Sequence, residues 1–209
     1  MAADGTPGAR KQPQFLGGGA PATAVDLNIL ADHTAEMGNS MALSTADREA
    51  FESDGWEGLF CYDTDEDAIY RHDGSAWVVF WHDWKAYTPT ATNASGGTLA
   101  GTFMRLGKTI HVGVRHLSPT ITGQPTYLLP VAAADTATYW FDGGGVARDN
   151  SPATEFQLVA RKISDTSVGP YLLAIPTTYT QFANVSATVP FTWATNDFID
   201  LRFSYEAAA

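Results

Sequence analysis

From Gly58 onward, apolar and polar residues alternate with a period of two, the pattern of half-buried β-strands. The acidic stretch Asp63–Asp67 and the dipeptide Asp73-Gly74, which readily adopts positive φ, divide residues 59–87 into three runs. The apolar positions of these runs are Phe60, Tyr62, Ile69, Trp77 and Val79. We therefore predict a three-stranded β-meander, a module near the minimum size for independent stability.

The alternation continues from Tyr87 to the C-terminal region. Gly107-Lys108 fits a two-residue hairpin turn between GTFMRL and KTIHVGVRH. Ile110, Val112 and Val114 point to one face of the second strand, and Ile199, Leu201, Phe203 and Tyr205 do so in the last strand. Further runs lie at 127–131, 137–141, 156–163, 171–175 and 184–189. About eight regularly spaced strands predict an antiparallel, jelly-roll-like β-sandwich.

A helical period precedes the meander. Apolar or small residues recur at spacings of three and four over about two heptads, at Leu27, Leu30, Thr34, Met37 and Met41. Because so short a helix is costly to nucleate alone, this seam predicts packing with other copies of the chain, and an intrachain helical hairpin is the alternative. A second, shorter helix is expected over TADREAFES, capped by Ser44 or Thr45 and ended by Gly55.

Residues 1–23 are rich in Gly, Pro, Ala and Thr, and Phe15 and Leu16 are their apolar anchors. Such a segment is either a flexible tail or an extended arm that docks on a neighbouring subunit through these two residues. The patterns divide the chain into an arm with a short helix (1–42), a short helix with the meander (43–86) and a sandwich head (87–209). We find no secretory signal or membrane span in the sequence and expect a soluble product.

Charge narrows the choice of partners. The formal net charge is −11 and only 17% of residues are charged. An acidic chain lacks the basic patch that nucleic acid or an anionic membrane requires, so neither partner is expected. Cys61 is the single cysteine, so an intrachain disulfide is excluded. We predict that it is a small buried apolar residue.

No catalytic constellation is visible, and we expect neither an enzyme nor a cofactor. Motifs for nucleophile elbows, phosphate loops and metal-binding helices are absent. Asp63–Asp67 lacks the spacing of a Ca²⁺ loop and is interpreted as a turn of solvated acids. His111 and His116 should face opposite sides of one strand, which makes them a poor metal pair. We therefore predict no metal site. A pair of carboxylates that cleaves a glycan is a separate alternative, because two such residues need to be close in space and not in sequence.

One segment combines aromatic rings, a glycine run and polar side chains. Aromatic faces pack on sugar C–H faces, and Asp, Asn and Arg bond to the hydroxyl rim. The segment is therefore a candidate glycan site, and a plain strand end followed by a loop is the alternative. The candidate residues are Tyr139, Trp140, Asp142, Arg148, Asp149 and Asn150, with Gly143–Gly145 as a flexible turn.

The chain resembles structural proteins of tailed bacteriophages over residues 43–209. YDTDEDAIYRHDGSAWV is similar to a short meander module common in these proteins, and LSTADREAF to the small helix that often precedes it. YTPTATNASGGTLAGTFMRLGKTIHVGVRH resembles the opening of their C-terminal sandwich, and PTYLLPVAA and PFTWATNDFIDLRFSYEA resemble its middle and final strands.

This resemblance implies a minor tail or receptor-binding protein, typically a homotrimer made in the host cytoplasm and located on the virion. The N-terminal arm would bind other tail or capsid proteins, and the sandwich would attach to a host cell-envelope glycan. The alternative is a purely structural capsid fibre, decoration or baseplate component without a receptor. The resemblance carries no binding residues across, because no ligand motif is shared.

Overall fold

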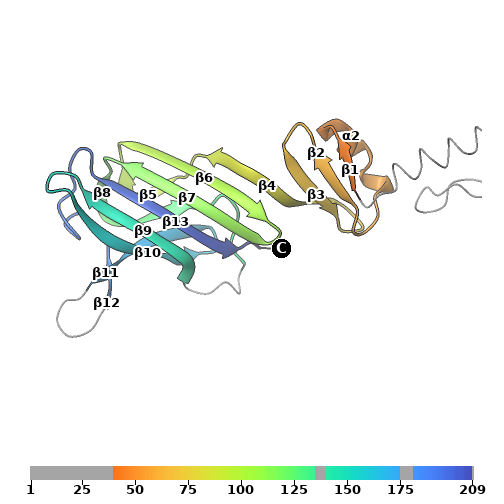
Figure 1. Cartoon of the computed structure of the whole chain (residues 1–209). Coiled ribbons are helices and arrows are strands. Elements are labelled where there is room, and N and C mark those ends of the chain that lie inside the picture. Colours follow the sequence, from red (N-terminus) through yellow and green to blue (C-terminus); the bar gives the residue numbers. More distant parts are fainter. Residues whose placement is uncertain (1–39, 135–139, 175–180, 209) are drawn as a thin grey trace, which may run out of the picture. The chain divides into compact units, whose positions relative to one another are not determined.

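The computed structural model describes residues 40–134, 140–174 and 181–208, which are mainly β (Figure 1). The predicted mainly-β class is therefore confirmed. The described residues up to His82 form one compact unit and those from Asp83 form a second. Strand β4 (Trp77–Tyr87) contributes residues to both units.

The first unit contains the predicted meander. Strand β2 (Phe60–Asp63) pairs with β3 (Ala68–His72), and β3 pairs with β4, both antiparallel. Strand β1 (Ser40–Leu43), which the sequence did not predict, adds to β2 in parallel. Helix α2 (Thr45–Ala50) and a 3₁₀ turn, η1 (Glu52–Asp54), connect β1 to β2.

Ser44 begins helix α2 as predicted, because its Oγ accepts a hydrogen bond from the Asp47 backbone N–H at 3.2 Å. The C-cap of the α-helix is Phe51, four residues before the predicted end, and Gly55 follows only the 3₁₀ turn. The Asp73-Gly74 turn is also confirmed, with Gly74 at a φ of 102°.

The buried face of β2 and β3 is the opposite of the predicted one. Leu59, Cys61 and Asp63 are fully buried, whereas Tyr62 is 41% exposed. The inversion arises because Arg48 of helix α2 is also buried and forms an ion pair with Asp63, so a polar residue occupies a core position. Cys61 is confirmed as a small buried residue.

Met41 lies in β1, opposite Cys61, and packs against the core of the first unit. Its predicted place in a helical seam is therefore wrong: the spacing from Met37 to Met41 matches a helix, but Met41 is a strand residue. The other seam positions and the two anchors of the arm lie outside the described residues; these are Leu27, Leu30, Thr34, Met37, Phe15 and Leu16.

The second unit is a single path of strands in the order β4-β6-β7-β13-β9-β10-β11-β8-β5, with β12 beside β11. Among the described residues, strands β5 to β13 of this unit pair in antiparallel registers, as predicted. The strands of this unit after β4 are β5 (Ala91–Ser95), β6 (Thr98–Leu106), β7 (Thr109–Leu117), β8 (Thr120–Leu128), β9 (Trp140–Asp149), β10 (Thr154–Ser164), β11 (Ser167–Ala174), β12 (Gln181–Asn184) and β13 (Phe198–Glu206).

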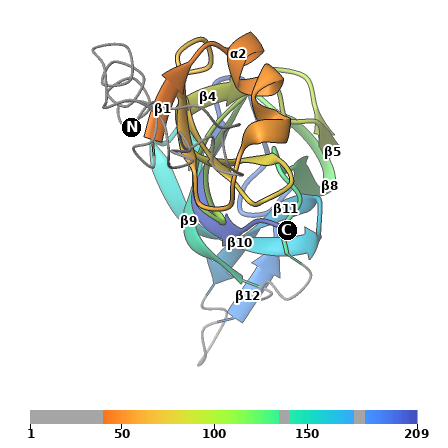
Figure 2. The same cartoon turned by 90° about the vertical axis from the view of Figure 1, so that its right-hand side faces the viewer.

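This sheet folds back so that its two ends enclose one core. Tyr127 of β8 contacts His116 of β7 although the two strands lie far apart in the strand order. Strands β9 and β8 lie on opposite sides of this unit in Figure 2. The predicted alternation of β7 and β13 is confirmed, because their inward residues are almost completely buried: Ile110, Val112, Val114, Ile199, Leu201, Phe203 and Tyr205. The hairpin at Gly107-Lys108 is confirmed as well.

Gly143–Gly145 do not form a flexible turn but lie inside strand β9, so this part of the prediction is wrong. A Cβ atom at Gly145 would meet the carbonyl oxygen of Asp200 on β13, and one at Gly144 would meet that of Leu158 on β10. The glycines therefore allow β9 to lie very close to both neighbouring strands, a role of strand glycines distinct from turn formation.

Candidate functional site

The structure does not bring the predicted glycan-binding residues into one site. Tyr139 lies outside the described residues. Trp140 is the first and Asp149 the last of the 10 residues of β9. At about 3.3 Å per residue, these two positions are roughly 30 Å apart. Asp142 lies near the Trp140 end, so the five candidates that the structure describes belong to two separate regions.

The polar residues at the far end of β9 mainly organise the turn into β10. Arg148 Nη1 donates to Glu155 Oε1 at 2.8 Å, and Asp149 Oδ1 accepts from the Ser151 backbone N–H at 3.0 Å. The Asn150 backbone N–H donates to Asp197 Oδ1 at 2.8 Å. This end of β9 therefore adjoins the loop that precedes β13.

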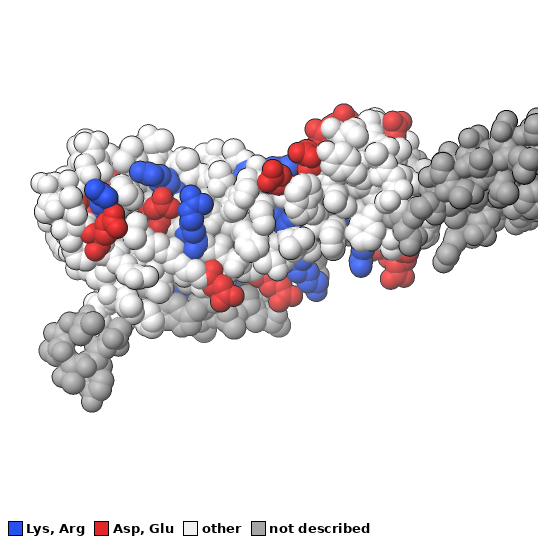
Figure 3. All heavy atoms as spheres, in the orientation of Figure 1, with Lys and Arg blue, Asp and Glu red and all other residues white. Residues whose placement is uncertain are grey.

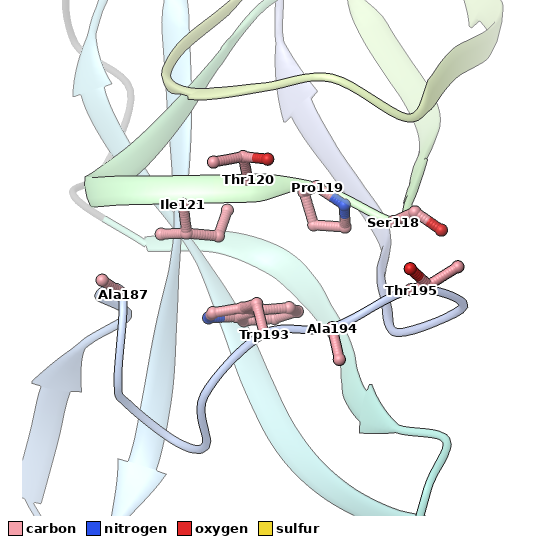
Figure 4. Close-up of a pocket in the computed structure, with 8 residues that line it drawn as sticks. All are labelled: Ser118, Pro119, Thr120, Ile121, Ala187, Trp193, Ala194 and Thr195. Carbon is pink, nitrogen blue, oxygen red and sulfur yellow. The ribbon is translucent and has the colours of Figure 1, made fainter.

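That loop forms one wall of a surface pocket of about 310 Å³. The other wall is the start of β8 and the residues before it. Figure 4 shows the Trp193 ring beneath Ile121 and Pro119, with Ser118 and Thr195 at one side and Ala187 at the other. We call this hollow the Trp193 pocket; it is lined by Ser118, Pro119, Thr120, Ile121, Ala187, Trp193, Ala194 and Thr195.

A buried carboxylate holds the loop in place. Asp197 is only 1% exposed; its Oδ1 accepts from Asn150, and its Oδ2 accepts from the Ala194 backbone N–H at 2.6 Å. Its carbonyl oxygen accepts from the Ser118 backbone N–H at 2.7 Å. Because both carboxylate oxygens are hydrogen-bonded, the burial of this acid is compensated, and the two walls are joined through one residue.

Both walls contain backbone in the left-handed region. Ser118 has a φ of 52° and Asn196 a φ of 71°. Ser118 Oγ accepts from the Asn196 backbone N–H at 2.9 Å, so the two unusual residues stabilise each other. Non-glycine residues with such backbone are uncommon and cluster at ligand sites, where the surrounding structure holds them in shape.

Trp193 is held in one orientation. Its indole Nε1–H donates to the Ser186 carbonyl oxygen at 2.9 Å, and the centre of its ring lies 4.5 Å from the centre of the Phe191 ring. Trp193 is half-buried, packs against the core cluster and also lines the pocket. The pocket lining combines this fixed indole ring with the hydroxyl-bearing residues Ser118, Thr120 and Thr195, which are the two kinds of group that bind sugars.

The acidic turn is not a cluster of solvated acids throughout, because Asp63 is completely buried. Its Oδ2 accepts from Arg48 Nε and from Thr45 Oγ1, both at 2.9 Å. In the ranges that the structure describes, no group of three or more His, Cys, Asp or Glu is arranged to hold a metal ion. The burial and hydrogen bonds of Asp63 are therefore explained by a structural role, which is to stabilise the first unit.

Comparisons with protein-family models, with curated proteins and with solved structures find no match to this chain. Within the described part of the chain, no helix has the length and apolar character needed to cross a bilayer.

Proposed function

We propose that the chain is a virion protein of a tailed bacteriophage that attaches to a host cell-envelope glycan through its second unit. The observation that carries the proposal is the Trp193 pocket, whose lining combines hydroxyl-bearing residues with an oriented indole ring on a loop fixed by Asp197. The resemblance of residues 43–209 to phage structural proteins supports the same function.

The proposed molecule is a homotrimeric minor tail or receptor-binding protein. Its second unit is a jelly-roll-like sandwich head, and its N-terminal arm binds other tail or capsid proteins. It is made in the host cytoplasm and located at the exterior of the virion. Three pockets of low affinity on one particle would gain avidity from their high effective concentration, so no single tight pocket is needed.

The pocket also suits this weak, repeated mode of binding. Its lining combines one aromatic ring with two alanines, the aliphatic side chains of Pro119 and Ile121, and three hydroxyl-bearing residues. Ser118 and Asn196 are held by each other before any ligand arrives, so binding orders little additional backbone.

The test is binding of the full-length protein and of Trp193→Ala to purified cell walls from a sensitive host. We expect the substitution to weaken binding at least tenfold, since it removes the aromatic platform. Trp84→Ala is the matched control, because Trp84 is 47% exposed and is not among the residues of the pocket.

Equal binding by both variants and the unmodified protein would refute the role of the pocket. No binding by any of the three would favour the alternative, a purely structural virion component without a receptor. Antibody labelling of virions would then show whether that component lies on the capsid or on the tail.

A further inference from the structure

A second pocket lies on the outer face of the sheet. It has a volume of about 190 Å³ and spans strands β6, β7 and β13. Gly113 and Arg115 alternate with the buried residues Val112 and Val114, so they belong to the outer face of β7. We call this hollow the Gly113 pocket; its outward side chains and floor are Ala100, Thr102, Gly113, Arg115, Asp200 and Arg202.

Glycine creates the floor of this pocket. In the antiparallel register, Thr102 of β6 lies opposite Gly113, and Gly113 lies opposite Arg202 of β13. On its other side, Arg202 lies opposite Gly144 of β9. The Arg202 side chain therefore has no side-chain neighbour at the directly opposed position of either adjoining strand, and the backbone beside it is bare.

Two hydrogen-bond donors converge over this bare backbone. The position that a Cβ atom of Gly113 would occupy lies 3.1 Å from Thr102 Oγ1 and 3.7 Å from Arg202 Nη1. A ligand oxygen just above this position is within reach of a hydroxyl and a guanidinium together. Among the described residues, Arg202 forms no ion pair, so its charge is available to such a ligand.

The charges around the pocket favour a singly charged ligand. Arg115 Nη1 lies 3.8 Å from Asp200 Oδ2, a long ion pair, and its guanidinium carbon lies 4.5 Å from the centre of the Phe198 ring. Two guanidinium groups and one carboxylate leave one net positive charge, on a chain whose formal net charge is −11. Figure 3 shows basic and acidic side chains interspersed over this face of the second unit. A monoanion would neutralise this net charge, whereas a dianion would leave one uncompensated negative charge beside Asp200.

We propose that the Gly113 pocket binds a singly charged oxyanion carried by a sugar polymer, either a carboxylate or a phosphodiester. Thr102 and Arg202 bind its oxygens above Gly113, and Arg115 adds electrostatic attraction. This inference rests on the proposed glycan attachment and specifies its ligand class: the host glycan is acidic.

The probes are methyl glucuronide, dimethyl phosphate and the neutral methyl glucoside, each titrated into full-length ¹⁵N-labelled protein and followed by NMR. We expect at least one anion to move the amide signals of Gly113 and Arg202, with a dissociation constant on the order of 1 mM. Methyl glucoside should bind this pocket at least tenfold more weakly. The tighter of the two anions identifies the source of the charge, and its affinity should fall as salt is added.

Arg202→Gln should weaken anion binding at least tenfold because it removes the unpaired charge. Gly113→Ala should do the same by placing a methyl group where the ligand oxygen binds. Lys108→Gln removes one positive charge from the exposed hairpin turn of the same unit and should leave the affinity unchanged. A dispersed spectrum establishes that each variant is folded, and Thr102→Val is the substitute for a variant that is not.

Three results would overturn the proposal. The first is that neither anion changes the amide signals, and the second is that methyl glucoside changes them as strongly as the anions do. The third is that Arg202→Gln and Gly113→Ala both bind the anion as tightly as the unmodified protein. Trp193→Ala should retain the anion response. Failure of cell-wall binding with an intact anion response would refute the attachment function while leaving the anion site standing, so the two failures are distinguishable.

Discussion

At the residue scale, the first unit depends on one buried ion pair. Asp63 accepts hydrogen bonds from Arg48 Nε and Thr45 Oγ1 at 2.9 Å and from the backbone N–H groups of Asp65 and Glu66 at 3.0 Å. Arg48 also lies 3.8 Å from the centre of the Tyr70 ring. Through these contacts a single carboxylate joins helix α2, the β2–β3 turn and the core of the unit.

We predict that Asp63→Asn destabilises the first unit by about 3–5 kcal/mol, because the buried Arg48 guanidinium loses its buried partner and keeps a 3.9 Å contact to the exposed Glu49 carboxylate. Urea unfolding followed by tryptophan fluorescence measures the change, and Glu57→Gln, which alters an exposed carboxylate of the same unit, is the control. A loss below about 1 kcal/mol, the range of exposed ion pairs, would contradict this role.

The same pair should make the first unit sensitive to acid. Burial opposes ionisation of Asp63, but the Arg48 side chain and the backbone N–H groups outweigh it and hold the pKa of Asp63 below its usual value. Because the pKa is lower in the folded state, the stabilisation is complete above about pH 4 and is lost as the pH falls through the folded pKa. Asp63→Asn should therefore reduce the dependence of unfolding on acid, while Glu57→Gln should preserve it.

The sequence could not reveal this buried acid. An aspartate in an acidic run between two short strands has the same local pattern whether it is solvated or paired, and Arg48 precedes it by 15 residues. Asp197 was missed for the same reason: its partners Asn150 and Ser118 are distant in sequence. The only available signal was the polar run Thr195-Asn196-Asp197 immediately before an apolar strand, which predicts a turn but not a pocket.

At the element scale, strands with clean alternation were predictable, whereas the strand with three consecutive glycines was not. Strands β7 and β13 have an apolar residue at every second position, so their buried faces follow directly from the sequence. Strand β9 carries three consecutive glycines, which locally resemble a turn, and only the proximity of β10 and β13 explains why they lie in a strand.

We predict that Gly145→Ala destabilises the second unit by about 3 kcal/mol, since the new Cβ atom would meet backbone atoms of Asp200 and Leu201, which cannot rotate away. Thermal unfolding monitored by circular dichroism measures the effect. In the control Gly123→Ala, the nearest atom to the new Cβ is Asn93 Cγ at 3.4 Å, an ordinary contact. Equal unfolding temperatures for the two variants would show that β9 can move away from its neighbours.

At the scale of the whole molecule, the two units have separate apolar cores. The first core contains Leu59, Cys61, Ala68, Tyr70 and Trp77, and none of these residues belongs to the core cluster of the second unit. The second unit encloses its own core with strands from both ends of one sheet path. Residues 83–209 should therefore fold without the first unit, and the predicted seam positions other than the strand residue Met41, from Leu27 to Met37, precede both cores in the chain.

This arrangement predicts where the proposed trimer is held together. We expect light scattering to give three times the chain mass of 22.4 kDa for the full-length protein and the mass of a single chain for residues 83–209. The reason is that the predicted seam, present only in the full chain, needs partner copies, whereas the second unit buries its core within one chain. A trimer of residues 83–209 would instead place the interface on the second unit. A single chain in both samples would exclude the trimer, and with it the avidity on which attachment through a pocket of low affinity depends.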